Sequence, residues 1–88
     1  MIYGSEPFDS PSEVYAFTNT LILKLQNLNL DASPLERVQS TAYTTSSEWL
    51  GELGSAVREV QHQRIIDSEI NFGLHRIMRL VHSVWPLL

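Results

Sequence analysis

The stretch from Asp67 to Trp85 constrains the fold more than any other part of the chain, because its apolar residues recur at the spacing of an amphipathic α-helix. At about 100° per residue, one broad face of this helix is apolar and the other is polar. The apolar face comprises Ile70, Gly73, Leu74, Ile77, Met78, Leu80, Val81, Val84 and Trp85. An isolated helix is only marginally stable in water. An apolar face of this width therefore predicts that other helices cover it.

A first helix is predicted over residues 11–28. The segment Ser10-Pro11-Ser12-Glu13 has serine at the N-cap, proline at the first helical position and glutamate at the third, which is the pattern of a capping box. Apolar residues then recur at steps of three and four, at Val14, Phe17, Leu21, Leu25 and Leu28. Residues 1–9 are expected to form an irregular arm, because Gly4 and Pro7 interrupt regular structure.

A second helix is predicted over residues 34–63, after the similar start Ser33-Pro34-Leu35-Glu36. Its apolar seam is Leu35, Val38, Ala42, Thr45, Trp49, Leu53, Ala56 and Val60, and we expect Trp49 to be buried. The middle is rich in threonine and serine, which are poor helix formers, and Thr45-Ser46-Ser47-Glu48 is itself a capping box. Because the seam keeps its phase, we favour one continuous helix, with a break near residues 44–47 as the alternative.

The third helix is predicted over residues 68–85, since the apolar stripe is rotated there, Asp67 or Ser68 can cap its start, and Pro86 ends it. Three helices with short links predict an all-α fold, a small antiparallel three-helix bundle, or four helices if the middle helix breaks. The predicted organisation is therefore a single domain over residues 10–88, preceded by the arm.

Self-association is predicted from the length of the middle helix. A helix over residues 34–63 would span about 45 Å, much longer than its neighbours. Part of its seam would stay uncovered, so we predict a homodimer with this helix at its centre. Other apolar residues also exceed what one seam per helix uses, namely Ile22, Leu23, Leu30, Trp85, Leu87 and Leu88.

Charge and composition argue against several classes of function. Ten acidic and six basic side chains give a net charge of −4 with a single lysine, so we expect no nucleic-acid partner. The absence of cysteine excludes disulfides, thiolate zinc sites and cysteine nucleophiles. No apolar run reaches the roughly 18 residues of a membrane span, and the N-terminus lacks the features of a signal peptide, which favours the cytoplasm. We find no set of residues for a metal, a cofactor or catalysis, and therefore expect an interaction protein rather than an enzyme.

The predicted partner-binding surface lies on the third helix. Phe72 falls on the polar face, with His75, Arg76 and Arg79 one or two turns further along. Aromatic residues and arginine are enriched where protein interfaces concentrate their energy. These four residues therefore predict a surface for an unidentified protein partner, unless Tyr3 or Phe8 of the arm covers Phe72.

Two short segments resemble known families and leave alternatives open. The run from Arg76 to His82 loosely resembles the R-x(4–6)-H pattern of HEPN domains, which implies a ribonuclease-like site at Arg76 and His82. It lacks the polar residue usual after the arginine. Trp49-Leu50-Gly51 is similar to the W-x-G signature of small secreted WXG-type helical hairpins, although here it falls inside a predicted helix. His75 and His82 are seven residues apart, rather than the four of helical metal pairs, and are interpreted as surface histidines.

Overall fold

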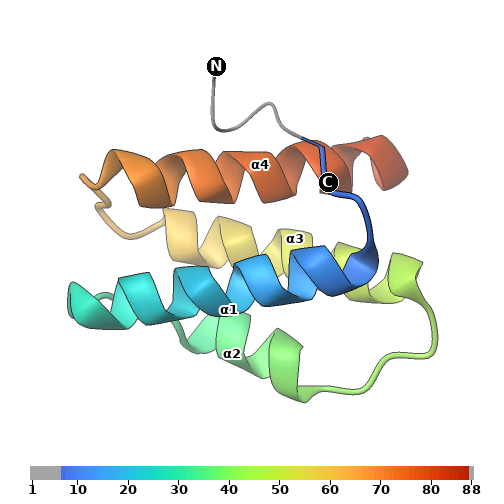
Figure 1. Ribbon diagram of the computed structural model, residues 1–88, viewed down its shortest axis with the longest axis horizontal. Helices are drawn as coiled ribbons and strands as arrows, with labels where there is room; N and C mark the ends of the chain where they lie inside the picture. Colours follow the sequence, from blue (N-terminus) through green and yellow to red (C-terminus); the bar gives the residue numbers. More distant parts are fainter. Residues whose placement is uncertain (1–6, 88) are drawn as a thin grey trace.

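The computed structural model describes residues 7–87, and this part of the chain forms four helices and no strand (Figure 1). The helices are α1 (Pro11–Asn27), α2 (Ser33–Ser40), α3 (Ser46–Gln61) and α4 (Ser68–Val84). Both α1 and α3 pack against α2 and α4, so the helices form a ring around a shared core. Figure 1 shows α4 running in the opposite direction to α1 and α3. The all-α prediction is confirmed.

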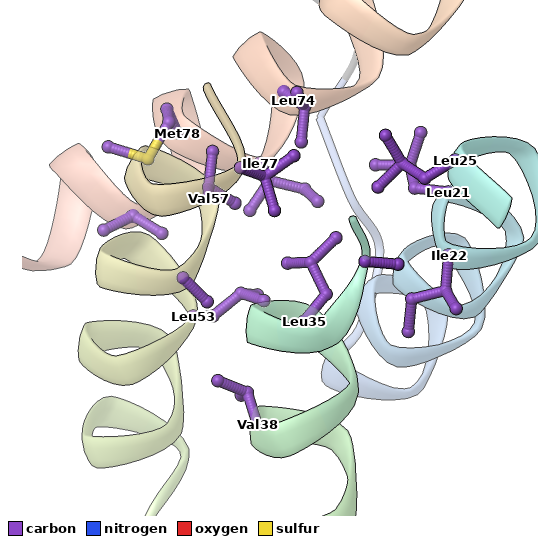
Figure 2. Close-up of a cluster of buried hydrophobic side chains, with 14 of the residues drawn as sticks. Leu21, Ile22, Leu25, Leu35, Val38, Leu53, Val57, Leu74, Ile77 and Met78 are labelled. Carbon is purple, nitrogen blue, oxygen red and sulfur yellow. The ribbon is translucent and has the colours of Figure 1, made fainter. Parts of the chain in front are cut away.

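The core draws large apolar side chains from all four helices. Leu25, Leu35, Leu53, Leu74 and Ile77 are completely buried, and Figure 2 shows side chains of α1, α2, α3 and α4 converging on one another. This burial is what makes the eight-residue α2 stable, since so short a helix does not persist alone in water.

The predicted apolar faces are largely the buried ones. On α4, the residues Ile70, Gly73, Leu74, Ile77, Met78 and Val81 are all buried, as predicted. Val84 and Trp85 at its end are 41% and 43% exposed, contrary to the expected face. Ile22, counted among the surplus apolar residues, belongs to the core. The seam analysis missed Leu50 and Val57, which are buried on α3.

Side-chain caps set the starts of α1 and α4 as predicted. The Ser10 hydroxyl accepts a hydrogen bond from the backbone N–H of Glu13 at 3.2 Å. The Asp67 carboxylate accepts from the backbone N–H of Ile70 at 2.9 Å. Each bond satisfies a donor that the first turn of a helix leaves without an internal partner.

The expectation of one continuous helix over residues 34–63 is wrong. The chain leaves the helix at Thr41, whose backbone is extended, and α3 begins at Ser46. The Thr45 hydroxyl accepts from the N–H of Glu48 at 3.1 Å, so the internal capping box acts as a true helix start. Ala42 and Thr45, members of the predicted seam, are exposed, and Trp49 is only half-buried. The break also removes the overlong helix on which the homodimer prediction relied.

The start of α2 differs from the predicted Ser33 capping box. Ser33 is already the first helical residue, and its N–H donates to the Asp31 carboxylate at 2.9 Å. The N-cap is Ala32, whose carbonyl accepts from the N–H of Glu36 at 3.0 Å, while Asp31 accepts from the N–H of the first helical residue. Hydrogen bonds from the Ser33 side chain and backbone hold the pKa of Asp31 below its usual value, with a smaller contribution from the charge of Arg37.

The lowered pKa of Asp31 predicts a measurable pH dependence. A folded-state pKa below the unfolded one stabilises the protein above the unfolded value, and this stabilisation is lost as pH falls through the folded value. We therefore expect the Asp31→Asn variant to lose less stability than the wild type between about pH 5 and pH 2. Urea melts at several pH values measure the difference, and parallel pH profiles for the two proteins would contradict it.

The end of α1 is a Schellman motif centred on Asn29, whose φ of 58° lies in the left-handed region. The N–H of Leu30 donates to the carbonyl of Leu25 at 2.9 Å, and that of Asn29 to the carbonyl of Gln26 at 3.0 Å. The left-handed conformation at Asn29 suits glycine even better than asparagine.

We expect Asn29→Gly to raise the free energy of unfolding by about 0.5–1 kcal/mol, because glycine adopts this backbone conformation without steric cost. Asn29→Ala should have the opposite effect, since alanine lacks both the freedom of glycine and the local hydrogen bonding of asparagine. Thermal melts of the three proteins give the order, and an Asn29→Gly variant less stable than Asn29→Ala would refute this reading.

Candidate functional site

A hollow lies between the first turns of α1 and α3 and the segment that follows α2. Figure 1 shows that α1 and α3 begin at the same end of the molecule, on the right. The hollow has a volume of about 400 Å³, and Pro11, Tyr15, Val38, Tyr43 and Trp49 line it together with serine and threonine hydroxyls. A second hollow of about 210 Å³ adjoins it and shares Pro11 and Trp49 as walls. We refer to the two together as the aromatic groove.

The helix break creates this groove. The extended segment after α2 carries Tyr43 along the surface before Thr45 starts α3. In a continuous helix, residues 41–45 would be helical. No connecting segment would then exist to form a hollow with α1. Tyr43 and Trp49 both pack partly against the core, so the floor of the groove is continuous with the interior.

Hydrogen bonds fix the Tyr15 wall. Its ring lies 6.3 Å from that of Trp49, at a tilt of 36°. The Tyr15 hydroxyl donates to the backbone carbonyl of Gln39 at 3.2 Å, and the Gln39 amide donates back to the Tyr15 carbonyl at 2.9 Å. The same amide donates to Asn19 at 3.0 Å. The wall is therefore held in place before any partner arrives.

Two donors in the groove are unused within residues 7–87. Among the described residues, neither the Tyr43 hydroxyl nor the Trp49 indole N–H has a hydrogen-bond partner. The other indole behaves differently, because Trp85 Nε1 donates to the Ser47 carbonyl at 2.8 Å. Trp49 and Tyr43 thus combine apolar area with a donor available to a ligand.

The charges around the groove are acidic. Among residues 7–87, no basic side chain lines either hollow, whereas Asp9 lines the second. Glu52 lines a neighbouring hollow that shares Val38, Thr41 and Tyr43 with the first. That neighbouring hollow also contains Arg37, which forms an ion pair with Glu59 at 3.1 Å.

Glu48 adds to this acidity, since it is exposed and directly precedes Trp49 in α3. Within the described part of the chain, neither Glu48 nor Glu52 has an ion-pair partner. The surface beside the aromatic groove is consequently negative.

The structure divides the predicted surface of Phe72, His75, Arg76 and Arg79. Phe72 is 41% exposed, and His75 and Arg79 are exposed. Arg76 instead lies inside the chain, with 13% of its side chain exposed. The partner-binding role of the four residues stays a prediction, and Tyr3, the other residue expected to cover Phe72, lies outside the described residues.

Arg76 joins the arm to α1 and α4. Its guanidinium donates to the Pro7 carbonyl at 3.2 Å and to the Glu13 carboxylate at 3.3 Å. It also lies 3.9 Å from the ring centroid of Phe8 and 4.8 Å from that of Phe17, and the two rings meet edge-to-face at 5.3 Å. We call this group the Arg76 clasp, comprising Pro7, Phe8, Glu13, Phe17 and Arg76.

The two family resemblances gain no support from this geometry. The arginine that a ribonuclease-like pair with His82 would need already bonds to Glu13 in the clasp. Trp49-Leu50-Gly51 lies in the first turns of α3 rather than in a link between helices. Gly51 instead faces Trp85, whose indole would lie 3.5 Å from an added Cβ.

No family model, curated protein or solved structure matches this chain. Within the described residues, no group of three or more histidine and acidic side chains could hold a metal ion. None of the described helices combines the length and apolar character needed to cross a membrane. The case for function therefore rests on the geometry of the surface.

Sequence reasoning missed the groove, because a continuous helix over residues 34–63 contains Tyr43 and leaves no connecting segment beside the first helix. One signal was available. The threonines and serines of residues 41–47 and the capping box at Thr45 mark a break, and Tyr43 is the aromatic residue within it.

Proposed function

We propose that this chain is a small protein-interaction module without a catalytic site, and that it binds its partner in the aromatic groove. The supporting observation is a hollow walled by Tyr15, Tyr43 and Trp49, in which two hydrogen-bond donors are unused within the described chain. Tyrosine and tryptophan dominate the energetics of protein interfaces because they join a large apolar area to a polar atom. The cytoplasm stays the expected compartment, on the sequence argument alone.

Homodimerisation is part of this proposal, on a different basis from helix length. Leu23 on α1 and Leu28 at its C-cap are 61% and 50% exposed, and Ile66 in the link to α4 is 88% exposed. Burying such side chains against a second copy would be favourable. Light scattering at high micromolar concentration decides the matter, and a monomeric mass there removes the dimer from the proposal.

The groove is tested by comparing two matched tryptophan variants. Trp49→Leu removes a groove wall, whereas Trp85→Leu makes the same change at a half-exposed tryptophan that lines neither hollow. Tagged protein is used to capture partners from the native host, and circular dichroism confirms that each variant is folded. We expect Trp49→Leu and Tyr43→Leu to lose capture that Trp85→Leu retains.

A third variant separates this site from the surface on α4. Phe72→Ser alters the predicted patch and leaves the aromatic groove intact, since Phe72 lines a hollow beside Phe17 and Lys24 instead. If Phe72→Ser abolishes capture and Trp49→Leu does not, the partner binds α4 and the groove assignment is wrong.

A further inference from the structure

We infer that the aromatic groove accepts an extended, proline-containing peptide segment with an arginine or lysine at its flank. This inference rests on the proposed function and specifies its ligand. It follows from the shape of the groove, its unused donors and the charge beside it.

The shape suits a polyproline II segment. Two adjoining hollows meet at the shared walls Pro11 and Trp49, and tyrosine rings stand along the larger one. A polyproline II helix has three residues per turn and rises about 3.1 Å per residue, so every third side chain faces the same way, about 9 Å apart. Aromatic-lined grooves bind such segments because proline rings stack on aromatic faces and the ligand loses little entropy.

The unused donors favour the same ligand over a helix. A polyproline II segment makes no internal hydrogen bonds, so its carbonyl groups are free to accept. Tyr43 and Trp49 line the groove, and we expect their hydroxyl and indole N–H to donate to these carbonyls. A helical ligand has already paired most of its carbonyls, and strand addition needs a sheet edge, of which residues 7–87 contain none.

Charge complementarity defines the flank of the ligand. Asp9, Glu48 and Glu52 lie in or beside the groove, and the described residues lining its two hollows include no basic side chain. Such a field attracts cations and repels acidic segments. A proline-containing segment with a basic flank therefore fits better than a neutral or acidic one.

The test is a titration of isotope-labelled protein with a synthetic peptide of two arginines followed by a run of prolines. Two matched peptides replace the arginines by glutamates, or the prolines by alternating glycine and serine. We expect the arginine–proline peptide to shift the Trp49 indole resonance and to bind tightest, by about tenfold or more over either control. Equal binding of the three peptides, or no shift at millimolar concentration, would overturn the inference.

Variants connect binding to the proposed contacts. Tyr43→Leu should abolish the shift of the Trp49 indole resonance, and Trp49→Leu, which lacks that resonance, should abolish the backbone amide shifts of the other groove residues. The Glu48→Gln, Glu52→Gln double variant should weaken binding about 2- to 10-fold, as expected for exposed ion pairs. Glu36→Gln, an exposed glutamate on α2 outside the hollows, should leave affinity unchanged. Loss of affinity in Glu36→Gln equal to that in the double variant would show that only net charge matters and would overturn the specified flank.

Failure of this inference is distinguishable from failure of the proposed function. If the peptides do not bind while partner capture still depends on Trp49 and Tyr43, the groove is an interaction site for a different ligand. If capture is indifferent to both residues, the groove is not the site, and both proposals fall.

Discussion

Arg76→Ala is expected to lower the free energy of unfolding by about 2–3 kcal/mol, a large share of the stability of so small a domain. The guanidinium is almost buried and contacts two phenyl rings, the Pro7 carbonyl and the Glu13 carboxylate. Truncation removes the two cation–π contacts and leaves the Glu13 carboxylate without its partner. Glu13 also accepts a hydrogen bond from the N–H of Asp9, so the approach of the arm to α1 is weakened as well.

Urea denaturation measures this loss, and Arg79→Ala is the matched control. Arg79 is on the same helix but exposed, so its removal should change stability by less than about 0.5 kcal/mol. Arg76→Lys should recover only part of the loss, because an ammonium cannot lie flat on both rings. Equal effects of Arg76→Ala and Arg79→Ala would mean that the Arg76 clasp does not stabilise the fold.

Gly73→Val is the second large effect, with an expected loss of about 2–3 kcal/mol. An added Cβ at Gly73 would lie 2.7 Å from Cδ2 of Leu21 and 3.3 Å from the Phe17 ring. Leu21 is 2% exposed and has little space to retreat, so α1 and α4 would have to move apart. The glycine thus permits the close approach of the two helices.

Gly51→Val is the control for this substitution. It makes the same change in helix propensity, but the atom nearest to an added Cβ at Gly51 belongs to the Trp85 indole, at an ordinary 3.5 Å. Because Trp85 is half-exposed and can shift, we expect a loss below about 1 kcal/mol in thermal or urea melts. Comparable losses at the two glycines would show that helix packing at Gly73 is looser than its contacts indicate.

Local sequence signals predicted the starts of those helices whose first backbone N–H groups are hydrogen-bonded by a nearby side chain. Ser10 and Asp67 cap helices that begin where expected, because a cap depends on residues three positions away. The prediction of a continuous middle helix was wrong because it gave the apolar spacing more weight than these local signals. The spacing of the apolar residues is the same for one long helix and for two helices whose apolar faces point the same way. The break between α2 and α3 is instead explained by the weak helix formers and by the Thr45 cap.

The candidate site could not be predicted in the same way, because it depends on contacts between distant residues. Tyr15 is held as a wall of the groove by its hydrogen bond to Gln39, 24 residues further along the chain. Arg76 is drawn away from the predicted partner surface because it bonds to Glu13, 63 residues away. Helical periodicity assigns a residue to one side of its own helix, and it does not reveal which distant side chain meets it there.

The Arg76 clasp also has a kinetic consequence. The other main helix contacts join neighbours along the chain, α1 with α2, α2 with α3 and α3 with α4, whereas α1 and α4 close the ring between the first and last helices. Bringing α1 and α4 together closes the longest loop of the chain and so has the largest entropic cost. We therefore expect this contact to form after the transition state for folding. Interactions absent from the transition state slow unfolding without hastening folding. The clasp therefore determines how long each molecule stays folded, and hardly how quickly it folds.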